Sequence, residues 1–312
     1  MDVRNLKGNL FLLVATIIWG CTFVAQDIVA NAKLIGSFEF HAVRTLIGAV
    51  VLVPVILIAD AVKKKQGTYE KPTPRSRKTL LFGGIVCGAF HCLAANLQQV
   101  GMTLGTSSGK AGFITAMYII FVPIIGLFLK HKIQPHIYGC IVFAVAGLYL
   151  LCAFGDKGFL QISIGDFITL LCAVAFAMHI LAVDSFVEKT DCIKLSCLQF
   201  VFSGLIATVL TFVFENGFHP SYVMELIGPI LFAGVLSCGI AYTFQVIGQK
   251  YSTSSTVASL IMSFESVVSV VASAIYLGTV LKTHEYVGCA LMFVAVIASQ
   301  IDLGLIFKKR KA

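Results

Sequence analysis

Ionisable side chains inside long apolar runs are the residues of this sequence most able to do chemistry. Glu265 lies near the middle of the apolar run 255–278, and on a helix it would share a face with Ser269 and Tyr276. If such a run crosses a membrane, a carboxylate within it usually faces a bundle interior or an aqueous cavity. We therefore predict that Glu265 accepts a proton or contacts a cationic solute. The alternative is a structural carboxylate that holds its helix to a neighbour by hydrogen bonds.

Polar and aromatic side chains at helical spacing are further candidates for a solute site. The run 226–248 carries a polar stripe on one face, and the run 79–100 carries another. These two runs hold equivalent positions in the repeat described below, so their stripes could line opposite walls of one cavity. The predicted substrate-binding residues are Trp19, His91, Asn96, Gln98, Tyr118, Tyr242, Gln245 and Glu265.

Some of these candidates also have structural explanations. Trp19, the only tryptophan, could stack on a planar or cationic solute or could fill the core. Buried amides are often satisfied by neighbouring helices. His91 alone is better explained as a hydrogen-bonded core histidine than as a titrating switch.

Charged residues near helix ends suggest a gate. Asp27, Arg44 and Lys110 would lie at a similar depth, a turn or so below one membrane surface. A carboxylate near a helix C-terminus is disfavoured by the helix dipole, so Asp27 should seek a cation. We predict that it pairs with Arg44 or Lys110 as a latch in one state. Asp184 is its equivalent in the second half of the chain, without equivalent cations. Static anchors at the headgroup boundary are the alternative.

The elements that position these residues are expected to be membrane-spanning helices. The chain is 58% hydrophobic and 12% charged, and a span needs about 20 mostly apolar residues to cross roughly 30 Å of hydrocarbon. Runs of this kind lie near 9–29, 38–59, 79–100, 107–129, 136–154, 163–185, 194–214, 226–248, 255–278 and 286–306. We predict an all-α integral membrane protein with ten transmembrane helices.

The runs form one unit written twice. Residues 8–27 recur in pattern at 165–184, so that Trp19 corresponds to Phe176, and the Thr-Ser-Ser string at 106–108 recurs at 253–255. Because each unit holds five spans, the second would enter the membrane from the opposite side, giving two inverted five-helix repeats. The predicted boundaries are 1–155 for spans 1–5, 163–307 for spans 6–10 and 308–312 for a basic cytoplasmic tail.

The net charge of +8 is placed asymmetrically. With the N-terminus inside, only Lys33, Lys157 and Lys282 fall in outer loops, and the other Lys and Arg outside the spans fall on the inner side. The positive-inside rule then predicts cytoplasmic termini and a multi-pass protein of the plasma membrane. This placement argues against nucleic acid as a partner. The scattered cysteines do not resemble disulfide or metal sites, so no metal or cofactor is predicted.

Several local strings resemble the EamA-like branch of the drug/metabolite transporter superfamily. They are Trp19-Gly20 with Phe23, the stretch 40–44, the string 109–115, Leu198-Gln199-Phe200, the string 241–245 and Phe264-Glu265. The resemblance covers nearly the whole chain and implies the five-plus-five helix fold and movement of amino acids, other small metabolites or drugs, commonly outward. The family often has Pro where Ser266 stands and Glu where Thr279 stands, so roles of those two residues do not carry over.

The repeat indicates transport, because two inverted copies can form states of similar energy that open to either side. We expect a secondary active transporter that exports small amphipathic metabolites such as amino acids. Protons are the default coupling ion because no ATP-binding motif occurs. The expected partners are a small-molecule solute and the lipid bilayer, and a homodimer is left open.

A membrane enzyme acting on lipid and a channel are the alternatives. His179 and Asp184 form an H-x-x-x-x-D string, but on a continuous helix these side chains would point about 140° apart, so we do not expect an enzyme. A channel would favour a repeated filter loop or a ring of charges, which the sequence lacks.

Overall fold

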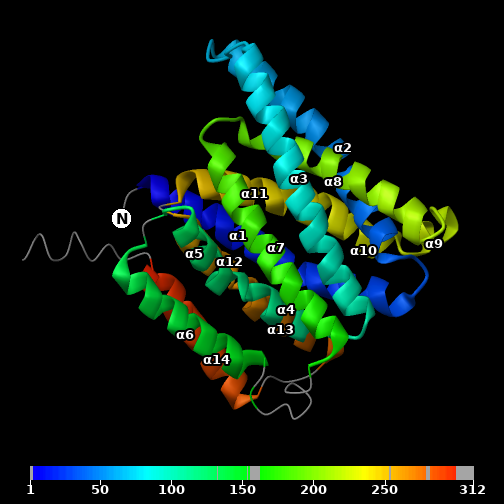
Figure 1. The fold of residues 1–312 in the computed structure, drawn as a ribbon, viewed down its shortest axis with the longest axis vertical. Coiled ribbons are helices and arrows are strands. Elements are labelled where there is room, and N and C mark those ends of the chain that lie inside the picture. The colour runs from blue at the N-terminus through cyan, green and yellow to red at the C-terminus, as the bar shows by residue number, and fades with distance from the viewer. Residues whose placement is uncertain are drawn as a thin grey trace, which may run out of the picture.

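The computed structural model describes residues 3–131, 133–152, 154, 162–252, 254–278 and 282–299, which form helices and short connections with no strand among them (Figure 1). The first half contains α1 (Val3–Ala32), α2 (Ser37–Lys65), α3 (Pro74–Thr103), α4 (Ser108–Ala116), α5 (Tyr118–Phe128) and α6 (Pro135–Cys152). The second half contains α7 (Ile164–Val187), α8 (Cys192–Phe214), α9 (Pro220–Glu225), α10 (Ile227–Leu231), the π-helix η1 (Phe232–Ala241), α11 (Tyr242–Tyr251), α12 (Ser255–Met262), α13 (Glu265–Leu277) and α14 (Thr283–Ser299). The predicted tail 308–312 lies outside the described residues.

Among the described residues, eight helical stretches are long and apolar enough to cross a membrane. The predicted fifth and tenth spans correspond to the shorter apolar helices α6 and α14. With 18 residues, α6 is about 27 Å long at 1.5 Å per residue, close to the roughly 30 Å thickness of the hydrocarbon layer. The chain is an all-helical multi-pass membrane protein, and ten spans stay a prediction.

Helices of the first half pack mainly on helices of the second. The most extensive pairings are α3 with α7, α6 with α14, α2 with α8 and α3 with α8, followed by α1 with α11 and α13. Figure 1 shows α6 and α14 side by side at one edge of the bundle. In the first half the third span, α3, packs on α7, the first helix of the second half. In the second half the third span, through α11, packs on α1, the first helix of the first half. The halves form one interlocked bundle.

Glycine allows the closest of these crossings. A Cβ atom added to Gly165 of α7 would lie 2.6 Å from the carbonyl oxygen of Gly101 in α3. A Cβ atom added to Gly288 of α14 would likewise lie 2.6 Å from the carbonyl oxygen of Gly147 in α6. Small residues let helix backbones approach each other closely in membranes. Both crossings join the two halves of the chain.

The fourth and ninth spans, expected to be continuous helices, are each broken. The first break lies at Met117, between α4 and α5, and the second lies at Ser263 and Phe264, between α12 and α13. Both are tightened turns, in which Met117 N donates to Ile114 O at 3.1 Å and Phe264 N donates to Ile261 O at 3.1 Å. In the repeat that aligns 106–108 with 253–255, the two breaks fall at the same position. Serine hydroxyls that bond back to helix carbonyls, as in α12 and α13, favour such bends.

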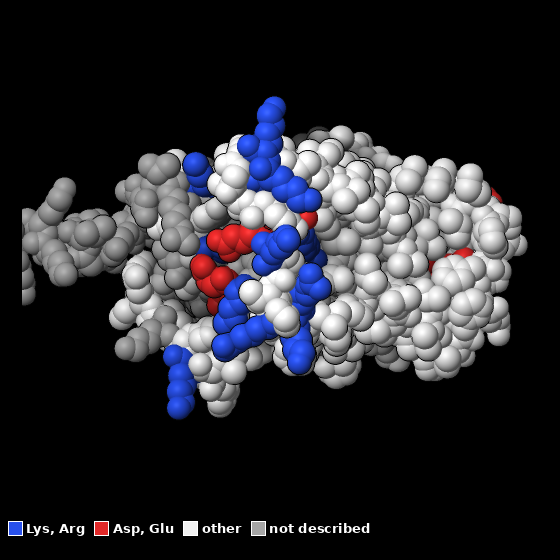
Figure 2. All heavy atoms as spheres, turned by 90° about the horizontal axis from the view of Figure 1, so that it is seen from above, with Lys and Arg blue, Asp and Glu red and all other residues white. Residues whose placement is uncertain are grey.

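Charged side chains occupy only part of the surface. Figure 2 looks down on the molecule from the top of Figure 1 and shows Lys and Arg gathered with some Asp and Glu, beside a broad area that shows no Lys or Arg and only small patches of Asp or Glu. Large apolar side chains such as Ile58, Val142, Phe212 and Phe293 are more than half exposed. Soluble monomers rarely expose apolar surface so widely, whereas lipid contact requires it.

Candidate functional site

A cavity lies between the helices and takes its walls from both halves of the chain. The first half contributes Trp19, Thr22, Phe23, Gln26, Arg44, Gln98, Thr115 and Tyr118, and the second contributes Phe176, Ile180, Ser237, Tyr242, Gln245, Met262 and Glu265. The walls combine aromatic rings, amides and one charged side chain of each sign.

Glu265 lies in the cavity wall directly after the second helix break. It occupies the first turn of α13 and is only 5% exposed. Tyr118 is the first residue of α5, holds the matching position at the other break, and donates from Oη to Glu265 Oε1 at 3.0 Å. The positive end of the α13 dipole also favours a carboxylate here. The two breaks therefore meet through a phenol–carboxylate hydrogen bond.

Arg44 supplies the positive charge. It projects from α2 into the cavity wall and is 4% exposed. Its Nη2 atom donates to His41 Nδ1 at 3.3 Å, and its guanidinium lies 4.9 Å from the centroid of the Phe40 ring. Among the described residues, no carboxylate forms an ion pair with Arg44. A buried guanidinium without a counter-charge is costly, so an anionic group would be bound favourably beside it.

Two glutamines at matching positions of the repeat, Gln98 in α3 and Gln245 in α11, line the same cavity. Gln98 accepts from Gln26 Nε2 at 3.0 Å and donates from Nε2 to Thr115 Oγ1 at 3.1 Å. Gln245 donates from Nε2 to Gln249 Oε1 at 3.0 Å. The Gln98 amide is thus held by the protein on both sides, whereas Gln245 is held only through its nitrogen.

Aromatic rings form the apolar wall. The rings of Trp19 and Tyr242 lie 4.7 Å apart between centroids, and Phe176, the repeat counterpart of Trp19, also lines the cavity. Trp19 Nε1, Arg44 Nε and Gln245 Oε1 are buried without a hydrogen-bond partner among the described residues. Buried polar groups in native proteins are rarely left so. Three such atoms on residues of one cavity favour a site for a polar ligand.

The π-helix η1 changes which residues of the eighth span reach the cavity. An α-helix would place Cys238 and Tyr242, four positions apart, on one face. In the structure Ser237, inside the π-helix, and Tyr242, directly after it, line the cavity; they are five positions apart, and the Tyr242 backbone N–H donates to the Ser237 carbonyl. Short π-helical stretches often occur at functional sites. This register shift is not visible in the sequence periodicity.

The structure brings most of the predicted substrate-binding residues together. Trp19, Gln98, Tyr118, Tyr242, Gln245 and Glu265 line the cavity, whereas His91 and Asn96 do not. His91 is fully buried, with Nδ1 at 3.0 Å from Ser203 Oγ and its ring 4.6 Å from that of Tyr242, so it supports the wall from behind. Asn96 donates from Nδ2 to the carbonyl of Cys92 at 2.8 Å.

The residues of the predicted latch are separated in this structure. Lys110 Nζ lies 2.7 Å from Asp166 Oδ2, a pair that sequence reasoning missed, and Arg44 lines the cavity. Asp27 and Asp184 are half-buried, and the ion pairs among the described residues do not include them. A latch between Asp27 and a cation stays a prediction for another state.

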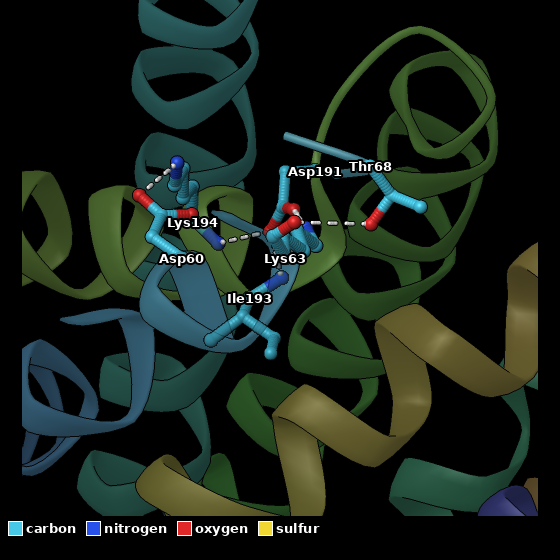
Figure 3. Close-up of polar contacts among 6 residues, drawn as sticks. All are labelled: Asp60, Lys63, Thr68, Asp191, Ile193 and Lys194. Atoms are coloured by element: carbon cyan, nitrogen blue, oxygen red, sulfur yellow. Dashed lines mark hydrogen bonds and ion pairs between the residues drawn. The ribbon is translucent and has the colours of Figure 1, made fainter. Parts of the chain in front are cut away.

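Two ion pairs join the C-terminal end of α2 to the N-terminal end of α8 (Figure 3). Lys63 Nζ lies 2.6 Å from Asp191 Oδ2, and Lys194 Nζ lies 2.8 Å from Asp60 Oδ2. Asp191 also accepts from the backbone N–H groups of Ile193 and Lys194. Burial would raise the pKa of the Asp191 carboxyl, but the hydrogen bonds from Lys63 and from the backbone outweigh it and hold that pKa below its usual range.

Comparison with known proteins agrees with this architecture. The sequence profile of the EamA-like transporter family matches the chain twice, over residues 6–153 and 163–299. An uncharacterized transporter of Archaeoglobus fulgidus is 27% identical over 300 residues, covering 95% of this chain and 86% of that protein. The uncharacterized transporter YoaV of Bacillus subtilis is 26% identical over 260 residues, covering 81% of this chain and 83% of its own length.

A solved crystal structure shares the fold. It superposes with a TM-score of 0.68 at 16% identity, covering 95% of this chain and 97% of that chain. At this identity the likeness concerns the path of the backbone alone.

Proposed function

Because the chain belongs to the EamA-like transporter family, we propose that it is a secondary active carrier that moves small amphipathic solutes by alternating access. That it is a membrane transporter follows from the family and from relatives named as transporters. The observation that carries the finer proposal is the cavity, whose walls come from both halves and hold one charge of each sign.

Alternating access needs two states of similar energy, and we propose that two inverted repeats, 1–155 and 163–307 with five spans each, provide them. The corresponding pairings of α3 with α7 and of α11 with α1 support this symmetry. The matching helix breaks support it as well, since broken helices near the middle of a bundle commonly mark carrier sites. A small change at either break would alter the angle between two rigid half-helices.

The solute class follows from the cavity walls. Trp19, Phe176 and Tyr242 would hold an apolar portion, while Gln245 and the two charged side chains would hold polar groups. Amino acids are a class of metabolite that combines these features. Outward transport, a plasma-membrane location and cytoplasmic termini complete the proposal, on the family resemblance and the positive-inside rule.

Proton coupling is proposed at Glu265. It is the carboxylate that lines the cavity, and it lies at a helix break whose movement would change its surroundings. A carboxyl group that is alternately protonated and bound to solute can link the flow of the two, because both compete for the same charge.

Transport in proteoliposomes tests the proposal. Vesicles preloaded with unlabelled solute should take up labelled solute faster than empty vesicles, and initial rates should saturate. A panel of amino acids and an unfractionated metabolite extract supply the solutes. Flux that rises linearly with concentration and does not respond to preloading would indicate a channel instead. Chemical conversion of a lipid would indicate an enzyme.

A further inference from the structure

We propose that the transported solute is a small zwitterion whose carboxylate binds Arg44, whose ammonium binds Glu265 and whose apolar portion packs on Trp19 and Tyr242. This inference rests on the proposed function and deepens it by assigning charge recognition to two residues. The juxtaposition that carries it is a buried guanidinium from α2 and a buried carboxylate from α13 in the wall of one cavity.

Arg44 is organised as an anion-binding group. A guanidinium keeps its charge in proteins and offers five donors in a planar fork that suits carboxylates. Arg44 Nη2 donates to His41 Nδ1 at 3.3 Å, and the Phe40 ring lies against the guanidinium. The Nε atom of Arg44 has no hydrogen-bond partner among the described residues. Because Arg44 is 4% exposed, water compensates it poorly. A solute carboxylate would supply both the counter-charge and the acceptors.

Glu265 is organised to receive a cation. The phenol of Tyr118 donates to Oε1, and the ion pairs among the described residues do not include this carboxylate. The phenol hydrogen bond stabilises the carboxylate without neutralising it, so Glu265 in its deprotonated form can pair with a solute ammonium. An ammonium beside the rings of Tyr242 and Trp19 would also gain from the negative faces of those rings.

The two charges together give more discrimination than either alone. A solute with only one charge leaves the opposite protein charge buried and uncompensated, so it forgoes the charge-assisted hydrogen bonds that a zwitterion makes at that end. The site should therefore prefer a zwitterion over an acid or an amine of the same shape.

Ligands that differ in one charge test this directly in the intact protein. Leucine, phenylalanine and methionine are each compared with the matching amide, which lacks the carboxylate, and with the matching deaminated acid, which lacks the ammonium. Binding is followed by the fluorescence of Trp19, the only tryptophan, which lines the cavity. At least one zwitterion should bind roughly 10- to 100-fold more tightly than its amide and its acid, as expected for one charge-assisted hydrogen bond.

Variants assign the two ends. Arg44→Gln should abolish the preference for the zwitterion over the amide and keep the preference over the acid. Glu265→Gln should abolish the preference for the zwitterion over the acid and keep the preference over the amide. Arg75→Gln and Glu70→Gln make the same exchanges at exposed positions and should change neither ratio. If Arg44→Gln fails to fold, Arg44→Lys and the ligand series in the unaltered protein still decide the question.

Several results would overturn the inference. One is equal binding of a zwitterion and its singly charged analogues, and another is an equal loss of all three ligands in either Gln variant. Saturable transport of solutes from the extract with no zwitterion among them would reject the inference and leave the carrier function standing. Absence of binding and of counterflow for every solute would reject the function itself.

Discussion

Trp19 shows how a single side chain connects the repeat, the cavity and an experiment. It lies in α1, packs against Tyr242 of α11, and matches Phe176 in the second half of the chain. The sequence could indicate that this aromatic position recurs, because the alignment of 8–27 with 165–184 has no gap. It could not indicate that both rings face one cavity, since that depends on how α1 and α7 are rotated in the bundle.

Replacing Trp19 with Ala should weaken solute binding about tenfold, because the solute loses a large apolar surface and the Tyr242 ring loses the ring packed against it. The measurement is the rise in melting temperature produced by solute, since a ligand that binds the folded state stabilises it. Phe128→Ala is the control, because Phe128 is 84% exposed on the surface of α5. An unchanged solute-induced shift in Trp19→Ala would remove Trp19 from the site.

Among the elements, α8 is the helix whose start depends most visibly on one side chain. Asp191 accepts from the backbone N–H groups of Ile193 and Lys194 and also pairs with Lys63 of α2. Asp60 makes an ion pair with Lys194 of the same helix. Asp191 therefore both caps a helix and forms an ion pair, whereas Asp60 forms an ion pair alone, so variants of the two residues separate the two contributions to stability.

We predict that Asp191→Ala lowers the unfolding free energy by about 1–2 kcal/mol, from loss of a helix cap and an ion pair. Asp191→Asn should cost less, because Asn still caps a helix; its own cost isolates the ion pair, and the difference between the two variants isolates the cap. At Asp60, which makes the ion pair alone, Ala and Asn should be equivalent, each costing about 0–1 kcal/mol. Melting temperatures in detergent supply the comparison, and equal effects of the two Asp191 variants would contradict it.

Acid should remove the contribution of the Asp191 carboxylate to the stability of the folded protein. The pKa of the Asp191 carboxyl is held below its usual range in the folded protein, so its contribution is fully present above about pH 4 and is lost as the pH falls through the lowered value. The advantage of the native protein over Asp191→Asn should therefore be constant between about pH 5 and pH 8. It should disappear on further acidification.

Sequence patterns predicted the helices better than their irregularities. Apolar runs locate the spans, but the break at Met117 and the π-helix η1 arise from hydrogen-bond choices that leave hydrophobicity unchanged. His91 and Gln98 share one face of α3, yet only Gln98 reaches the cavity. Arg44 was assigned to a latch from its distance to a helix end, which ignores the length of its side chain. Rotation and reach of side chains come from the packing of distant segments.

At the scale of the whole molecule, we expect the two halves to begin on opposite surfaces of the membrane. α1 begins beside the end of α11, because a Cβ atom on Gly8 would lie 2.8 Å from Tyr251 Cβ. α7 begins beside the end of α3, where Asp166 accepts from Thr106 Oγ1. Helices that cross the membrane in turn would place these two starts on opposite surfaces.

Cysteine labelling with a membrane-impermeant reagent tests this arrangement in cells. Lys157→Cys, in the joint 155–164 between the halves, should react from outside, whereas Lys7→Cys should react only after the membrane is opened. The joint itself lies mostly outside the described residues. Labelling of both positions from the same side would contradict the inverted arrangement.

The contact between Tyr118 and Glu265 also bears on how the chain arose. The two residues hold one position of a duplicated unit, so an ancestral pair of identical half-length chains would have faced tyrosine with tyrosine, or one carboxylate with another. Two carboxylates so close cannot both ionise. In a single polypeptide the two positions can differ, and here the contact pairs a donor with an acceptor. Two identical copies of either half, assembled as separate polypeptides, could not recreate it.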